Sequence, residues 1–313
     1  MASLKDIKLK ILSYKKTGTV THAMEAVSAV KMRKGQERAL SGRSYAAAAL
    51  SVLERLSGTA DIARHPLMQE GKGKKCFIVV TSDKGLAGSL NSGVIRKVDE
   101  VLAGKYFLEN DFVRNPKEIV IIAIGRRGAD YFTNRGYDVR ARHENVSDAV
   151  SEEQVRAITD EVLKWHATGD ISSVFVAYQN FLSTFEQKPT VRKIVPVKPE
   201  TMKETIAGIR PARGKYAPQE ATETVAPPAA YTIEPDADTV LSVLLPKLLN
   251  IAVFHALLEA KASEHSARMV AMKSATDKAK EMAQGLTRKF NKVRQAAITR
   301  EVSEITSGIE AMK

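Results

Sequence analysis

The feature of this 313-residue chain that most constrains its fold is where its prolines lie. All 11 prolines fall between Pro66 and Pro246, which leaves a long proline-free arm at each end. Proline removes a helix hydrogen-bond donor and clashes with the preceding turn, so its absence permits very long helices. We therefore predict long helices at residues 1–65 and 236–313, on either side of a mixed region at 74–231. A helical shaft that carries a head indicates a mechanical or bridging role.

The spacing of apolar residues predicts that both arms pack on one side. In the first arm they recur every three or four residues, as on the buried side of a helix, at Leu4, Ile7, Ile11 and Tyr14 and, after Gly18, at Val20, Met24, Val27 and Val30. The second arm repeats this spacing at Leu241, Leu244, Leu248, Ile251, His255, Leu258 and Ala262, then at Met269, Met272, Ala275, Ala279, Met282, Leu286, Phe290, Val293 and Ala297, and, after one slip, at Val302, Ile305 and Ile309. Sustained over so many turns, the pattern predicts an antiparallel coiled coil of the two arms.

The start of the second arm carries two signals. Asp236 or Asp238 is suited to cap the amino end of a helix, because a short carboxylate can accept hydrogen bonds from the first free backbone N–H groups. Pro246 falls inside the expected helix, so we predict a kink or a late helix start there.

The middle region changes to short apolar runs typical of buried strands. These runs alternate with helical segments, an order that predicts a small α/β domain with a largely parallel, Rossmann-like sheet. The expected strands are residues 76–81, 118–124 and 171–178, with 190–197 as an added edge strand, and the expected helices are 91–102, 128–134 and 151–167. Residues 198–230 hold five prolines and many Thr, Glu and Lys residues, so we interpret them as an extended or flexible insertion.

Charge is concentrated on the arms. The net charge is +12; residues 1–38 hold 9 basic and 3 acidic residues, and residues 260–313 hold 11 basic and 6 acidic residues, so the arms account for +11. A basic rod favours an acidic partner, whether nucleic acid, an anionic membrane face or an acidic protein. The apolar runs are too short to cross a bilayer, and the first residues lack the apolar core of a secretion signal.

Residue patterns that would indicate catalysis are missing from the sequence. Residues 81–91 follow an expected strand and precede a helix, where α/β proteins bind phosphate, yet they have neither P-loop nor dinucleotide-binding spacing. His255 and Glu259 lie one helical turn apart, which we interpret as packing. The single cysteine, Cys76, excludes an internal disulfide and a zinc site built on several cysteines. We therefore expect no enzymatic activity, cofactor or metal. A nucleotide-binding α/β enzyme and a nucleic-acid-binding coiled coil are the alternatives.

Four segments, in order along nearly the whole chain, resemble the γ subunit family of F-type ATP synthases. They are HAMEAVSAVKMRK at 22–34, TSDKGLAGSLN at 81–91, ARMVAMKSATD at 267–277 and FNKVRQAAITRE at 290–301. In that family the terminal helices form an antiparallel coiled coil inside a hexamer of α and β subunits, and the α/β head lies against the ε subunit and the membrane ring of c subunits. The resemblance implies a non-catalytic, proton-driven rotor shaft, peripheral to the cytoplasmic face of a bacterial inner membrane. The residues themselves identify neither the coupling ion nor the main direction of the reaction.

The resemblance also implies which residues touch partners. Those matched to hexamer contacts are Met24, Arg33, Lys34, Lys84, Arg268, Arg294, Gln295 and Thr299. Tyr231 and Glu234 match the stretch before the last helix, which approaches the c ring and ε. At Lys84 and Ala87 the chain departs from the Arg and Cys common in the family.

Overall fold

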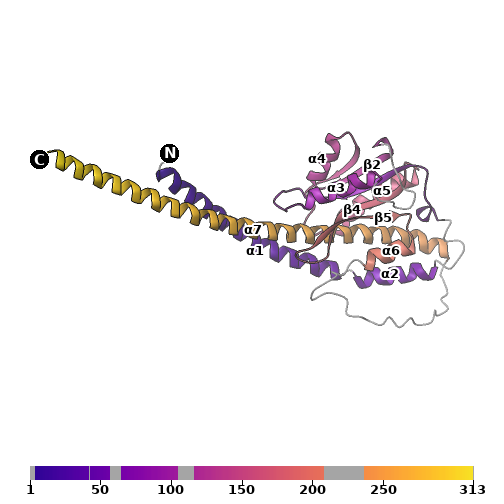
Figure 1. The fold of residues 1–313 in the computed structure, drawn as a ribbon. Coiled ribbons are helices and arrows are strands. Elements are labelled where there is room, and N and C mark those ends of the chain that lie inside the picture. The colour runs from indigo at the N-terminus through magenta and orange to yellow at the C-terminus, as the bar shows by residue number, and fades with distance from the viewer. Residues whose placement is uncertain (1–3, 42, 57–64, 105–115, 208–235, 313) are drawn as a thin grey trace. The chain divides into compact units, whose positions relative to one another are not determined.

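A computed structural model describes residues 4–41, 43–56, 65–104, 116–207 and 236–312 (Figure 1). The chain divides into two compact units. The coiled-coil unit comprises Met1–Ser28 and Arg268–Lys313, and the head unit comprises Ala29–Ala267. Two helices, α1 (Leu4–Ser41) and α7 (Ala237–Ala311), contribute residues to both units.

The head unit is built on one five-stranded sheet with the order β3-β2-β1-β4-β5. Its strands are β1 (Lys74–Val80), β2 (Ile119–Ile124), β3 (Asp138–His143), β4 (Ile171–Phe181) and β5 (Gln187–Val195). The first four are parallel, and β5 pairs antiparallel with β4 at the edge, which confirms the predicted largely parallel sheet with an added edge strand. β2 is buried along its whole length and most of β1 and β4 is buried, which explains their unbroken apolar runs.

Helices cover both faces of this sheet. One face packs against α3 (Leu90–Leu102) and α4 (Arg126–Asn134). The other packs against α2 (Arg43–Leu56), α5 (Glu152–Ala167), α6 (Pro199–Ala207) and the head part of α7. Two short 3₁₀ turns, at Pro66–Met68 and Pro116–Glu118, precede β1 and β2. The expected first arm is thus two helices, α1 and α2, and residues 42 and 57–64 lie outside the described residues.

Local capping fixes where the long elements start. Ser151 accepts a hydrogen bond from the Gln154 backbone N–H while the Gln154 side chain bonds back, a complete capping box for α5. Asp236 Oδ1 accepts from the Thr239 N–H at 2.8 Å, so the prediction of Asp236 as the N-cap of α7 is confirmed. Of the two alternatives predicted at Pro246, a kink or a late helix start, the late start is wrong, because α7 begins at Ala237 and continues through this proline.

Two further expectations are corrected by the structure. Residues 199–207 of the expected extended insertion form α6, which starts at Pro199, a residue favoured in the first turn, and buries Met202; residues 208–230 lie outside the described residues. The expectation that every apolar run is too short to cross a bilayer is also wrong. One helix, residues 238–311, contains a window apolar enough to cross a membrane, but half of that window is buried, as in the core helix of a folded domain.

In the coiled-coil unit, α1 and α7 run antiparallel along a seam of small residues (Figure 1). Gly18 lies opposite Ala279, where an added Cβ would be 3.6 Å from the alanine Cβ, and the hydroxyls of Thr21 and Thr276 are hydrogen-bonded at 2.7 Å. The buried positions follow a heptad spacing, which on α1 includes Ile7, Gly18, Thr21 and Ser28 and on α7 includes Met272, Thr276, Ala279 and Ala283.

The predicted stripe is therefore wrong after Gly18. Val20, Val27 and Val30 are 56–58% exposed, while the small or polar residues Thr21 and Ser28 are buried. On α7 the predicted Met272 and Ala279 are buried, but Thr276 and Ala283 are buried in place of Ala275 and Met282. The predicted end of the stripe, at Val302, Ile305 and Ile309, is exposed. Small side chains allow two helices to approach closely, so the larger apolar residues of α1 are left on the outer face.

Candidate functional site

The outer face of the coiled-coil unit is the first candidate site. The exposed large apolar residues in the coiled-coil part of α1 are Leu9, Leu12, Val20 and Val27. On α7, Ile298, Val302, Ile305 and Ile309 are 52–63% exposed at spacings of four, three and four. The register set by Gly18 and Ala279 places Leu4 opposite Val293, so this last stripe extends beyond the described part of α1. A helix face with this pattern is built to contact another molecule.

Predicted contact residues are distributed along this unit rather than gathered at one point. Met24 and Arg268 are half-buried, and Arg294, Gln295 and Thr299 are exposed on the last turns of α7. The Thr299 hydroxyl donates to the Gln295 carbonyl at 3.0 Å, within the helix. At about 1.5 Å per residue, Arg268 and Arg294 are separated by roughly 40 Å along α7. The structure therefore offers an extended surface.

The remaining predicted contacts belong to the head unit or lie outside the described residues. Arg33 and Lys34 are consecutive and exposed on α1, and Lys84 is exposed in the loop after β1. Tyr231 and Glu234 lie outside the described residues.

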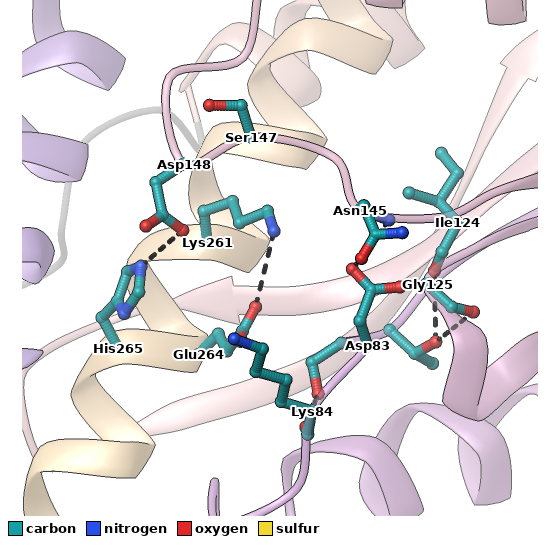
Figure 2. Close-up of polar contacts among 12 residues, drawn as sticks. Asp83, Lys84, Ile124, Gly125, Asn145, Ser147, Asp148, Lys261, Glu264 and His265 are labelled. Atoms are coloured by element: carbon teal, nitrogen blue, oxygen red, sulfur yellow. Dashed lines mark hydrogen bonds and ion pairs between the residues drawn. The ribbon is translucent and has the colours of Figure 1, made fainter.

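Near the basic pair the structure reveals an ionic cluster that the sequence did not indicate. Lys31 Nζ lies 2.7 Å from Asp148 Oδ2. On the other side of the carboxylate, His265 Nε2 lies 2.8 Å from Asp148 Oδ1 (Figure 2). Burial alone would raise the pKa of Asp148, but the hydrogen bonds from Lys31 and His265 hold that pKa at about 2. The cluster joins α1, the loop before α5 and α7 within the head. Its members are more than 100 positions apart in sequence, so no local pattern could have identified it.

The loop after β1 is the segment whose position most suggests phosphate binding. One of its own side chains, Asp83, occupies the hydrogen-bond donors that a phosphate would need. Asp83 accepts hydrogen bonds from the backbone N–H of Arg126, at the start of α4, and from that of Asn145, both at 3.0 Å. A phosphate would seek this helix N-terminus, but the Asp83 carboxylate already binds there (Figure 2). Thr81 Oγ1 also accepts from the Gly128 N–H at 2.9 Å, which ties the end of β1 to the first turn of α4.

The crevice where open α/β sheets bind ligands is filled. The strand order changes direction at β1 and β4, and ligands are expected beyond their carboxyl ends. There α7 packs across the edge, and Ser263 Oγ donates to the Gln179 carbonyl at 2.9 Å. Lys261 and Glu264 form an ion pair with side chains 14% and 11% exposed (Figure 2). The cavity that remains measures about 10 Å³, room for no more than a water molecule.

The sequence pair His255 and Glu259 lies inside the head core. The two side chains are 3% and 5% exposed, and His255 Nδ1 and Glu259 Oε2 have no hydrogen-bond partner. Burial lowers the pKa of His255 to about 4. Burial raises the pKa of Glu259 to about 7, against the opposing effects of Arg192 and a hydrogen bond with Tyr178. Both groups therefore favour their neutral forms in the core. Among the described residues, no group of three or more His, Cys, Asp or Glu side chains could hold a metal ion.

Comparisons with known proteins agree on one family. The family model described as ATP synthase matches residues 3–312. The chain is 36% identical to the ATP synthase gamma chain of Pelotomaculum thermopropionicum and 34% identical to that of Heliobacterium modesticaldum, with the whole of each chain covered.

Solved structures show the same fold. A chain of the Euglena gracilis mitochondrial ATP synthase (OSCP/F1/c-ring, rotational state 3) aligns with a TM-score of 0.63 and 18% identity, over 99% of this chain and 94% of that one. A chain of the Tetrahymena thermophila mitochondrial ATP synthase central stalk and c ring aligns with a TM-score of 0.58 and 22% identity, over 82% and 99%.

Proposed function

The chain belongs to the ATP synthase γ chain family, and from that premise we propose that it is the central rotor shaft of a proton-driven F-type ATP synthase. In this role it transmits rotation of the membrane c ring to the β subunits, whose catalytic sites it drives through their binding states. Its partners are the α and β subunits, the ε subunit and the c ring. The chain is a peripheral part of a membrane complex, at the cytoplasmic face of a bacterial inner membrane.

The observation that carries this proposal is the inverted pattern of the coiled-coil unit. Thr21 and Thr276 are buried, whereas Val20 and Val27 face outward. A free-standing coiled coil would bury its largest apolar residues between its helices. A shaft enclosed by a sleeve of other subunits can instead present them to the sleeve.

The filled crevice of the head supports a non-catalytic role. Asp83 binds the N-terminus of α4, and α7 leaves a cavity of about 10 Å³ at the point where a nucleotide would bind. We infer that the chain acts through its shape and its charged surface, and that its partner subunits catalyse the reaction.

Charged contacts suit the parts of the shaft that slide past the sleeve. Exposed ion pairs contribute only about 0–1 kcal/mol each and re-form readily, so they do not hold the rotor at one angle. Arg33, Lys34 and Arg268 act together against acidic β surfaces, and Met24 and Lys84 contact the same subunits. Arg294, Gln295 and Thr299 bind at the enclosed end of the shaft. Tyr231 and Glu234 approach the c ring and ε.

Co-purification tests the proposal most directly. A tagged chain isolated from its native membrane is expected to bring down α, β, ε and c subunits, and the chain alone is expected to hydrolyse no ATP. Sustained hydrolysis by the isolated chain, lost on changing Asp83 or Lys84, would favour the nucleotide-binding enzyme. Recovery without any of these subunits, together with steeply salt-dependent DNA or RNA affinity, would favour the nucleic-acid-binding coiled coil.

A further inference from the structure

One residue of the head, Asp148, contacts both helices that continue into the coiled-coil unit. On α1, Lys31 Nζ lies 2.7 Å from its Oδ2, and Arg38 Nη1 donates to its backbone carbonyl at 3.2 Å. On α7, His265 Nε2 lies 2.8 Å from its Oδ1 (Figure 2). Lys31 and Arg38 are about two helical turns apart, so they reach Asp148 from the same side of α1.

The loop that carries Asp148, between β3 and α5, is fixed before and after this residue. Before it, the Asn145 backbone N–H donates to Asp83 at 3.0 Å, and Val146 is buried in the head core. After it, Ser151 caps the first turn of α5. Asp148 is therefore held in place relative to the sheet, and the helices that it binds are held with it.

The Asp148 carboxylate is ionised and oriented by its partners. Burial opposes its ionisation, but the hydrogen bonds from Lys31 and His265 hold its pKa at about 2. An ionised carboxylate only accepts hydrogen bonds, so Nε2 of His265 carries a proton and donates it. The side chain of His265 is 5% exposed, which restricts its ring and keeps the second carboxylate oxygen directed toward Lys31.

The two helices differ in how the rest of the head holds them. α7 buries a stripe of large apolar residues between positions 241 and 257. In α1, by contrast, the buried residues within positions 29–39 are Gly35 and Ala39. Gly35 packs against Ala262 of α7, where an added Cβ would lie 3.6 Å from the alanine Cα. Such small residues bury little apolar area, so directional hydrogen bonds are needed to fix the rotation and register of α1 here.

We propose that Asp148 is a torsional anchor, a positioning residue through which the head turns α1 and α7 as one body. The inference rests on the proposed function, in which the head receives torque from the c ring and the coiled coil delivers it to the β subunits. The coiled-coil unit ends at Ser28 on α1 and resumes at Arg268 on α7, so Lys31 and His265 each lie three positions inside the head unit. The anchor thus holds each helix close to the point in the chain where it leaves the head unit.

Hydrogen exchange of the full chain tests the anchor without any partner. In Asp148→Asn, the backbone amides of α1 within positions 31–39 are expected to exchange about two- to fivefold faster, as for the loss of one exposed ion pair. Amides of α7 within positions 248–257 should not change. The matched control, Asp130→Asn, breaks a 2.6 Å ion pair with Arg142 away from both helices and should leave α1 unaltered. Unchanged exchange of α1 in Asp148→Asn would overturn the anchor.

Angular fluctuations of the stalled rotor in assembled complexes test its mechanical role. A bead is attached through Asn134→Cys, an exposed position at the end of α4; the native Cys76 is buried and burial raises its pKa to about 12, so it stays unlabelled. With the hexamer immobilised, Lys31→Met and Asp148→Asn should each increase the variance of the bead angle about twofold, since one of two attachments that share the torque is lost. The double variant should fluctuate no more than either single variant, because the two residues act as one pair.

The outcomes separate this inference from the proposed function. Arg142→Met removes a cation of similar exposure, 41% against 48% for Lys31, from an ion pair elsewhere on the head, and should leave the variance unchanged. Wild-type variance in both single variants, or an equal increase in the Arg142→Met control, would overturn the torsional role of Asp148. Failure of the unaltered chain to assemble with α and β would instead overturn the proposed function, and the hydrogen-exchange result would stand.

Discussion

Glu259 and His255, both buried in the head, are expected to change the stability of the folded chain with pH in opposite directions, so that their effects nearly cancel. The ordinary pKa of Glu259 is 4.5 and burial raises it to about 7. Between these values the folded chain keeps a proton that the unfolded chain releases, so stability falls as pH rises through this range. At about 1.4 kcal/mol per pKa unit, the loss amounts to about 3 kcal/mol.

His255 produces the opposite slope over nearly the same range. Its ordinary pKa is 6.5 and burial lowers it to about 4, so between these values the unfolded chain binds a proton that the folded chain rejects. Stability from this group therefore rises by about 3 kcal/mol as pH increases from 4 to 6.5. In the wild-type chain the two slopes nearly cancel between pH 4.5 and 6.5.

Single substitutions are expected to separate the two slopes. Measured by urea unfolding from pH 4 to 8, the free energy of unfolding of Glu259→Gln, relative to wild type, should increase by about 3 kcal/mol between pH 4.5 and 7. That of His255→Gln should decrease by a similar amount between pH 4 and 6.5. Glu153→Gln, an exposed position on α5, serves as the control and should show neither trend.

The opposite charge states would give a different result. If His255 and Glu259 formed a charged pair in the folded head, each single change would leave a buried unpaired charge and cost about 3–5 kcal/mol near pH 5.5, and the double change would cost less than the sum. That outcome, or differences that do not vary with pH, would refute the assignment of two neutral groups.

Three further predictions concern the shaft and the head loop. Ala substitution of Arg33, Lys34 and Arg268 together should lower ATP synthesis in assembled complexes clearly, while each single change has a modest effect; normal rates and coupling in the triple variant would show that these residues are solvated surface. Gly18→Leu should destabilise the coiled-coil unit by about 1–3 kcal/mol in thermal unfolding because Ala279 lies opposite, whereas Gly285→Ala, with open space around it, should stabilise it by up to about 1 kcal/mol. Gly125→Ala should cost about 3 kcal/mol in urea unfolding, since its Cβ would lie 2.2 Å from the Thr81 carbonyl oxygen, whereas Gly136→Ala, also at positive φ but in open space, should cost about 1 kcal/mol.

The parts of the fold that sequence reasoning found are those with strong local signals. β1, β2 and β4 are long apolar runs because they are buried, and Asp236 is a recognisable cap. β3 was missed because it lies at the edge of the sheet and alternates polar residues such as Arg140 and Arg142 with apolar ones. α6 was missed because Met202, the buried large residue among the side chains of α6 that the structure describes, gives no repeat.

The candidate site was less accessible to sequence reasoning, for a physical reason. The seam of the coiled coil uses Gly18, Thr21 and Ser28, which no hydrophobic pattern selects, so the neighbouring valines were mistaken for it. The ionic cluster around Asp148 joins residues far apart in the chain. Whether the residues matched through the family resemblance touch partners stays a prediction, since their contacts depend on other chains.

The inverted pattern of the shaft also links its stability to its surroundings. Burying a methyl or methylene contributes about 0.8 kcal/mol, and the seam around Gly18, Thr21, Thr276 and Ala279 offers few such groups. Close backbone approach and the Thr21–Thr276 hydrogen bond fix the register of the helices but add little burial. The apolar area that would normally stabilise a coiled coil is carried by outward residues such as Val20 and Val27, and it contributes only when another surface covers it. The surrounding subunits therefore stabilise the coiled coil by covering these outward residues. The same residues, such as Val20 and Val27, both stabilise the shaft and form its contact with the subunits around it.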